Sequence, residues 1–155
     1  MKSATATLQF ELEKLAPAGR VGVIALATDF NIERDLNALY PNDVQSFTSR
    51  LRNYNPLTIE NLRKMEPGLA ACADTILPGT ELDVVIYACT SGTIAIGSER
   101  ITQLIHQSRP NAAVTNPVTA ALAAFDSFKA KRISVLTPYT EAVNQDVAAF
   151  FESQG

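Results

Sequence analysis

The sequence predicts an α/β protein, a three-layer lobe in which helices cover both faces of a parallel, flavodoxin- or Rossmann-like sheet. Three observations indicate this class. Short apolar runs recur along the chain, helical patterns separate them, and most of the runs are rich in β-branched residues with little polar alternation. Strands that are buried on both faces of a parallel sheet have this pattern. With 155 residues, 46% of them hydrophobic and 19% charged, the chain can form one domain with a real core.

Four apolar runs are the predicted strands, and a fifth run is mixed in character. The four apolar runs are Val21–Ala27, Leu82–Ala88, Ala112–Thr115 and Ile133–Thr137. The mixed run, Val44–Leu51, carries polar side chains among its apolar ones. We therefore expect it to form a strand nearer an edge of the sheet.

Helical patterns lie between and after these runs, and we expect helices over residues 58–76, 93–106, 117–128 and 138–151. The Pro67-Gly68 step inside the first of them predicts a kink or a break. The Asn116-Pro117 step has the form of an N-cap followed by proline at the first helical position. Thr137-Pro138 predicts a second start of the same kind.

Two segments of the chain share one plan, an apolar strand followed by a threonine-containing turn and a helix start with asparagine and acids. They are VIALATDFNIERD from Val23 and ISVLTPYTEAVNQD from Ile133. We expect an N-terminal arm at residues 1–20, a first α/β lobe at 21–116 and the start of a second α/β lobe at 117–155. Because the second lobe receives only one strand and one helix before Gly155, we expect the chain to be a truncated piece of a two-lobed protein.

Charge and composition exclude several classes of partner. The net charge is −3 and no run of lysine and arginine could follow a phosphate backbone, which argues against nucleic acid. We find no apolar stretch long enough for a signal peptide or for a bilayer span, so we expect a cytoplasmic protein without a membrane partner. A single histidine excludes a multi-histidine zinc site, and we predict no metal.

The most chemically loaded segment is YACTSGT, which ends the run Leu82–Ala88 and opens a helical pattern. Ligands of open parallel sheets bind outside the carboxyl ends of the strands. Cys89 lies at such an end, where free N–H groups and the helix dipole favour a thiolate. Thr90, Ser91 and Thr93 add hydroxyls, and Gly92 allows a close backbone approach. Together they predict a thiol beside a cradle for a carboxylate or an enolate-like oxyanion.

Two other predicted strand ends bring polar residues toward the same edge, Thr28-Asp29 after the first run and Tyr139 after the last. Asp29 has two interpretations, a helix N-cap or an acid beside the thiol. Arg50 and Arg52 either anchor a substrate carboxylate or are simply solvated.

The two cysteines also call for separate interpretations. Cys89 itself has a plain alternative, because free cysteine is often a small buried hydrophobe. Cys72 lies on the apolar stripe of a predicted helix, and we interpret it as structural.

Four segments in this order resemble the aspartate/glutamate racemase superfamily: VGVIALATDFNIERD, NPLTIENL, LDVVIYACTSGT and RISVLTPYTEAVN. They cover essentially the whole chain from Val21 onward. The closer resemblance is to the branch of maleate cis-trans isomerases, arylmalonate decarboxylases and the ectoine utilization protein A group. CTSGT together with LTPYTEAVN is a fairly specific pair, whereas either motif alone is weak.

The resemblance implies two Rossmann-like lobes with a site between them, no cofactor, a small carboxylate substrate and a homo-oligomer. It identifies Cys89 with the cysteine of the first lobe and Tyr139 with a substrate-contacting tyrosine. The second cysteine of the family has no counterpart here, since Cys72 does not match it. Asp29 stands where maleate isomerases carry asparagine, and it resembles the aspartate of glutamate racemase. Leu26 likewise replaces a proline of the maleate isomerases.

Three functions follow as hypotheses. In a racemase, a thiolate removes an α-proton and a second thiol reprotonates the other face. In a maleate-type isomerase, Cys89 adds to a double bond, the bond rotates and the thiolate leaves. Decarboxylation is less favoured, because arylmalonate decarboxylases lack a cysteine at this position. The alternatives to an enzyme are a carboxylate-binding or regulatory module and an inactive fragment, with Cys89 structural in both.

Overall fold

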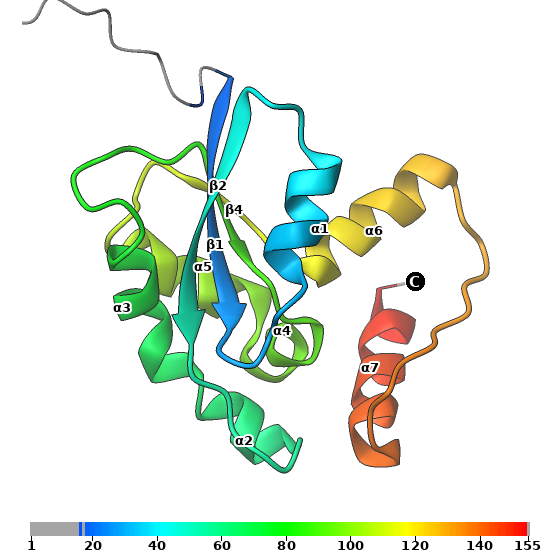
Figure 1. Ribbon diagram of the computed structural model, residues 1–155. Coiled ribbons are helices and arrows are strands. Elements are labelled where there is room, and N and C mark those ends of the chain that lie inside the picture. Colours follow the sequence, from blue (N-terminus) through cyan, green and yellow to red (C-terminus); the bar gives the residue numbers. More distant parts are fainter. Residues whose placement is uncertain (1–15, 17, 155) are drawn as a thin grey trace, which may run out of the picture.

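The structure is a computed structural model that describes residue 16 and residues 18–154, and it shows helices packed on a parallel sheet (Figure 1). The spatial order of the strands is β2-β1-β3-β4, and all three neighbouring pairs are parallel. The strands are β1 (Gly19–Leu26), β2 (Val44–Leu51), β3 (Val84–Tyr87) and β4 (Ala113–Thr115). This order confirms the predicted α/β class and the edge position of Val44–Leu51.

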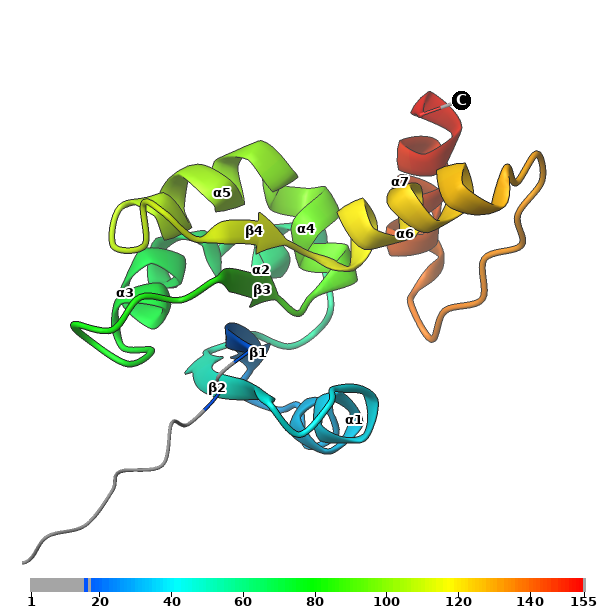
Figure 2. The same ribbon diagram turned by 90° about the horizontal axis from the view of Figure 1, so that it is seen from above.

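Strand β1 lies inside the sheet and buries both of its faces. Val21, Val23 and Ala25 pack toward helix α1 (Ile32–Leu39), whereas Ile24 belongs to the larger core on the other face. Figure 2 shows α1 on the opposite side of the sheet from α3 (Leu69–Asp74). The sheet therefore forms the middle of three layers, as the β-branched composition of β1 predicts.

The predicted helix over residues 58–76 is broken at Pro67-Gly68, as expected. It consists of α2 (Ile59–Arg63), the 3-10 turn η1 (Glu66–Gly68) and α3. The Thr58 hydroxyl accepts a hydrogen bond from the Asn61 N–H at 3.2 Å and caps α2. The proline has no N–H to continue the helical ladder, which accounts for the break.

The predicted helix over residues 93–106 is two helices, α4 (Thr90–Ile96) and α5 (Ser98–His106). Gly97 separates them with a φ of +97°, a conformation that favours glycine and ends α4. The helix also begins three residues earlier than predicted, because Cys89 acts as its N-cap. Cys89 is therefore the last residue of the short connection between β3 and α4.

Helix α6 (Pro117–Phe128) has the predicted bounds. The Asn116 side chain accepts hydrogen bonds from the N–H groups of Val118 and Thr119, at 3.1 and 2.9 Å. The Thr119 hydroxyl accepts in return from the Asn116 N–H at 3.1 Å, which completes a capping box. The cap and the proline at the first helical position together explain why the start of α6 could be predicted from the sequence.

The prediction of a strand at Ile133–Thr137 is wrong. These residues belong to an irregular connection that runs outside the sheet, and Leu136 is 99% exposed (Figure 1). A strand requires the N–H and C=O groups of a neighbouring strand, and the described residues place no strand beside this run. Its β-branched composition is therefore not sufficient to form a strand.

Helix α7 (Glu141–Ser153) begins later than the predicted start at Pro138. The Thr137 hydroxyl accepts a hydrogen bond from the Tyr139 N–H at 3.2 Å, which makes a turn ahead of the helix. Val143 and Val147 of α7 are buried, and α7 contacts α4. The rings of Phe125 and Phe151 join α6 to α7, with centroids 5.8 Å apart.

The N-terminal arm predicted at residues 1–20 lies mostly outside the described residues, and β1 begins at Gly19. The division of the chain near residue 117 stays a prediction. Within residue 16 and residues 18–154, no helix has the length and apolar character needed to cross a membrane.

Candidate active site at the β3–α4 junction

Cys89 lies two residues beyond β3, at the point where the chain turns into α4. Its backbone is extended, with φ −147° and ψ 111°, and its side chain is 7% exposed. The sulfur accepts a hydrogen bond from the Gly92 N–H at 3.3 Å, and the Ser91 hydroxyl lies 3.9 Å away. The first turn of α4 therefore directs a backbone hydrogen-bond donor, the Gly92 N–H, at the sulfur.

The three hydroxyls of the predicted cradle have different roles. Thr93 donates its hydroxyl to the Cys89 carbonyl at 2.7 Å and is buried, so this hydroxyl stabilises the helix start. Ser91 is also buried, and its hydroxyl faces the sulfur. Thr90 is half-buried. Only Ser91 of the three thus has its hydroxyl beside the thiol in the described residues.

Gly92 makes the close approach that the sequence predicted. A Cβ atom at this position would lie 2.9 Å from the Cys89 sulfur and 2.9 Å from the Met65 methyl carbon, and it would also collide with the Tyr87 hydroxyl. A methyl group therefore has no space here without displacing the Tyr87 hydroxyl, the Cys89 sulfur or the Met65 methyl.

Tyr87 is a site neighbour that sequence analysis missed. It is fully buried, and its hydroxyl has no hydrogen-bond partner among the described residues. Burial raises the pKa of the Tyr87 phenol far above its ordinary value, and the adjacent Cys89 raises it further. The two residues are two positions apart at a strand end, so their side chains share one face, and this spacing was the signal available in the sequence.

Asp29 follows β1, the strand that pairs directly with β3. Its carboxylate oxygen Oδ1 accepts hydrogen bonds from the N–H groups of Asn31 and Ile32, at 2.8 and 3.0 Å. Asp29 therefore binds N–H groups at the start of α1, although the N-cap residue itself is Asn31. The exposed Thr28 hydroxyl accepts a hydrogen bond from the Asn53 side-chain amide at 3.0 Å.

Arg50 is committed to the turn that carries Thr28 and Asp29. Its guanidinium donates to the Leu26 carbonyl at 3.1 Å and to the Asp29 carbonyl, and it forms an ion pair with Glu33. These contacts engage much of the guanidinium, although the Arg50 side chain is still partly exposed. Arg52 differs, since its guanidinium lies 5.7 Å from the ring centroid of Tyr54.

Tyr139 is half-buried and lies just before α7, the helix that contacts α4. Its N–H donates to the Thr137 hydroxyl, and its carbonyl accepts from the Asn144 side chain at 3.3 Å. The backbone at Tyr139 is thus held by its own turn.

Cys72 is the contrasting thiol. It lies in α3, is half-buried, and donates its thiol to the Arg50 carbonyl at 3.5 Å. Burial raises the pKa of Cys72, and a hydrogen bond with Ser49 offsets only part of that effect. No helix start directs N–H groups at this sulfur, so the thiolate is disfavoured.

Comparisons with known proteins were made on both sequence and structure, and no family model matches the chain. The maleate isomerase of Alcaligenes faecalis is 26% identical over 153 residues, which cover 88% of this chain and 59% of that protein. The chain is therefore similar in sequence to this maleate isomerase. It spans about 60% of the length of the relatives it matches.

Solved structures show the same fold. The maleate isomerase of Pseudomonas putida S16 with maleate gives a TM-score of 0.76 at 24% identity, covering 88% of this chain and 60% of that one. A cysteine-to-serine mutant of the Nocardia farcinica maleate cis-trans isomerase, with a covalently bound succinylcysteine intermediate, gives 0.77 at 20% identity and the same coverage. These matches confirm the predicted α/β fold of the lobe.

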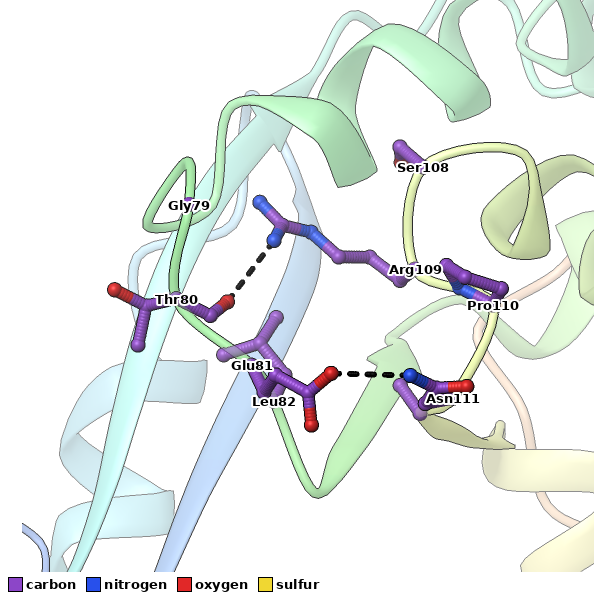
Figure 3. Close-up of a pocket in the computed structure, with 9 residues that line it drawn as sticks. Gly79, Thr80, Glu81, Leu82, Ser108, Arg109, Pro110 and Asn111 are labelled. Atoms are coloured by element: carbon purple, nitrogen blue, oxygen red, sulfur yellow. Dashed lines mark hydrogen bonds between the residues drawn. The ribbon is translucent and has the colours of Figure 1, made fainter.

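Two cavities in the described part of the chain lie away from Cys89. One, of about 740 Å³, lies between α6, α7 and the connection around Ile133. The other, of about 280 Å³, lies at the amino ends of β3 and β4 (Figure 3). No group of three histidine, cysteine or acidic side chains in the described part of the chain is placed to hold a metal ion.

Proposed function

We propose that this chain carries the nucleophilic cysteine of a cofactor-independent isomerase that acts on a small dicarboxylate, as maleate isomerases do. The observation that carries the proposal is the position of Cys89 at the start of α4, with the Gly92 N–H directed at its sulfur. Homology to a maleate isomerase supports the reaction class. A binding module that uses Cys89 only for packing would not need hydrogen-bond donors around the sulfur.

The proposed chemistry is addition and elimination of the thiolate. The sulfur attacks one alkene carbon of a cis dicarboxylate, the C–S bond forms, and the π electrons move onto the adjacent carbon and its carboxylate as an enolate. Rotation about the resulting single bond follows. The electrons then return to form the trans double bond, the C–S bond breaks and the thiolate is regenerated. The Gly92 N–H and the Ser91 hydroxyl stabilise the sulfur anion at both ends of the cycle.

Two observations favour this route over racemisation within the described residues. Racemisation needs a second proton carrier on the opposite face of the substrate. Cys72, the other thiol, lies on helix α3 and donates to the Arg50 carbonyl of β2. The Nocardia farcinica relative has been captured with a succinylcysteine intermediate, which is the adduct that thiolate addition produces once the enolate carbon takes up a proton. We therefore propose cis-trans isomerisation ahead of racemisation.

The remaining predicted site residues are proposed as substrate contacts. The hydroxyls of Thr28 and Thr90 are the accessible ones near the two strand ends, and Tyr139 precedes the helix that contacts α4. Ser91, Gly92 and Thr93 form the turn beneath the reacting carbon. Asp29 keeps Oδ2 free of hydrogen bonds among the described residues, and we propose that it acts on the substrate through this oxygen.

We further propose that residues 117–155 begin a second lobe, that the enzyme is a cytoplasmic homo-oligomer, and that it belongs near the ectoine utilization protein A group. The sequence similarity between the segments that begin at Val23 and Ile133 supports the second lobe, although only the first of them forms a strand. Size-exclusion chromatography with light scattering tests the oligomeric state, and a mass equal to one chain contradicts it.

The test of the function is conversion of maleate to fumarate by the full-length protein, followed by the ultraviolet absorbance of the two acids. Cys89→Ser should lower turnover by at least about a hundredfold, because serine is not ionised near pH 7. Cys72→Ser is the matched control and should retain turnover within about twofold. Turnover by Cys89→Ser within about tenfold of wild type contradicts the thiol mechanism.

A further inference from the structure

The Tyr87 hydroxyl is a buried polar group without a partner beside the thiol. Among the described residues it is one of three buried side-chain polar atoms that make no hydrogen bond, together with Asn53 Oδ1 and Ser108 Oγ. Tyr87 is fully buried, so no solvent satisfies its hydroxyl. A buried hydroxyl without a hydrogen bond destabilises the folded protein, so its presence calls for an explanation, such as a hydrogen bond that forms only when a neighbouring group ionises.

The geometry shows which group the hydroxyl faces. A Cβ atom built on Gly92 would collide with the Tyr87 hydroxyl oxygen and would also lie 2.9 Å from the Cys89 sulfur. Both atoms therefore contact the same backbone position of α4. The sulfur is a group at this position that changes from a weak to a strong hydrogen-bond acceptor when it ionises.

We propose that the Tyr87 hydroxyl donates a hydrogen bond to the Cys89 thiolate, which makes Tyr87 a positioning residue for the nucleophile. The proposal rests on the proposed function only in taking Cys89 to react as a thiolate. A neutral thiol accepts hydrogen bonds poorly and leaves the phenol unsatisfied. Ionisation creates the missing acceptor, so the phenol and the Gly92 N–H then stabilise the anion together.

Tyr87 remains a donor throughout the pH range in which a thiol ionises. Burial raises the pKa of its phenol, and the neighbouring Cys89 adds to the effect, so the proton stays on the oxygen. A hydrogen bond from a protonated phenol to a thiolate lowers the free energy of the thiolate without transferring a charge.

Other titratable groups near α4 are more exposed than Tyr87. Arg63 of α2 donates to the Ala95 carbonyl at 3.1 Å, away from the helix start. The remaining charged side chains of α2, α5, α6 and α7 are exposed: Glu60, Glu99, Arg100, Asp126, Glu141, Asp146 and Glu152. Solvent screens such charges strongly. Asp29 follows the adjacent strand, with Oδ1 held by backbone N–H groups.

The experiment measures the rate of Cys89 alkylation by iodoacetamide against pH, read by mass spectrometry, in wild type and in Tyr87→Phe. We expect the midpoint of the profile to rise by about one pH unit, with a rate at pH 7 lower by up to about tenfold. Thermal unfolding of Tyr87→Phe should occur at the same or a higher temperature, because an unsatisfied buried hydroxyl has been removed. Tyr54→Phe is the matched control and should leave the profile unchanged.

A folded Tyr87→Phe protein whose profile coincides with that of wild type overturns the proposal. If Tyr87→Phe does not fold, 3-fluorotyrosine placed at position 87 keeps the shape of the ring and makes the phenol a stronger donor. The midpoint should then fall, and an unchanged midpoint also overturns the proposal. No substrate is present in either experiment, so this outcome is separate from that of the maleate assay.

Discussion

The two ends of the sheet both gather polar side chains, but they use them differently. At the amino ends of β3 and β4, Arg109 donates to the carbonyls of Ala73, Asp74, Thr80 and Ile76. There the Asn111 side chain also donates to Glu81 at 3.0 Å (Figure 3). At the carboxyl ends, the Cys89 sulfur accepts a hydrogen bond from the Gly92 N–H, and the Tyr87 hydroxyl has no partner among the described residues.

In this molecule a cavity is a weaker sign of function than an unsatisfied hydrogen-bond donor. The amino-end cavity of about 280 Å³ is lined by charged and polar groups, yet Arg109 spends its donors on backbone carbonyls that α3 and the following turn leave free. That end is structural. The carboxyl end retains unused hydrogen-bonding capacity next to a thiol, and we expect chemistry there.

The largest effect on stability should come from the amino end. Arg109→Met removes the donor to four backbone carbonyls, two of them in buried hydrogen bonds, and we expect a loss of about 2–3 kcal/mol in the free energy of unfolding. Urea denaturation measures this loss. The rate of Cys89 alkylation in the folded protein should not change. Arg34→Met, on an exposed side chain that pairs with Asp35, is the control and should cost less than about 0.5 kcal/mol. An altered alkylation rate in folded Arg109→Met would show that the two ends are coupled.

Gly92→Ala should affect both stability and chemistry. The added methyl group displaces the Cys89 sulfur or the Tyr87 ring, and we expect a cost of about 1–3 kcal/mol. Alkylation of Cys89 should also shift along the pH axis, since the donors around the sulfur move. Gly19→Ala is the matched control, because a Cβ there meets only ordinary contacts at 3.8 Å and beyond. Wild-type stability in Gly92→Ala would contradict the close approach.

Arg50→Ala should have a moderate and local effect. It removes the hydrogen bonds to the Leu26 and Asp29 carbonyls on a partly exposed side chain, and we expect a cost of about 1 kcal/mol. Hydrogen exchange of the amides of residues 27–33 should become faster. Arg52→Ala, which loses only its contact with Tyr54, should leave those amides protected. Equal exchange in both variants would show that Arg50 does not hold this turn.

The sequence predicted the elements whose neighbours lie in the described chain and failed where no neighbour is present. Leu82–Ala88 and Ile133–Thr137 have similar β-branched composition, but only the first contains a strand, because β1 and β4 flank it. Helix caps are local signals: the cap at Asn116 was predicted from the sequence, and the cap at Thr58 is explained by the adjacent residues. The start of α7 was misjudged because the Thr137 hydroxyl makes a turn that competes with a helix at Pro138.

The candidate site was predictable in its position and less so in its contacts. Cys89 and Gly92 are adjacent along the chain, so their geometry follows from the strand-to-helix junction. Arg50 binds a turn more than twenty residues away, and no local pattern reveals such a contact. The two-residue spacing along a strand could have placed Tyr87 on the same face as Cys89. That its hydroxyl lacks a hydrogen-bond partner among the described residues becomes visible only in the assembled core.

Competitive alkylation of the two cysteines in the native protein tests the central claim most directly. Iodoacetamide at pH 7, with the labelled peptides quantified over time, should modify Cys89 at least about tenfold faster than Cys72. Burial raises the pKa of Cys72, so its labelling should accelerate only at alkaline pH, and a saturated dicarboxylate such as succinate should slow Cys89 alone. Equal rates for Cys72 and Cys89 in the folded protein would contradict the assignment of Cys89 as the reactive thiol.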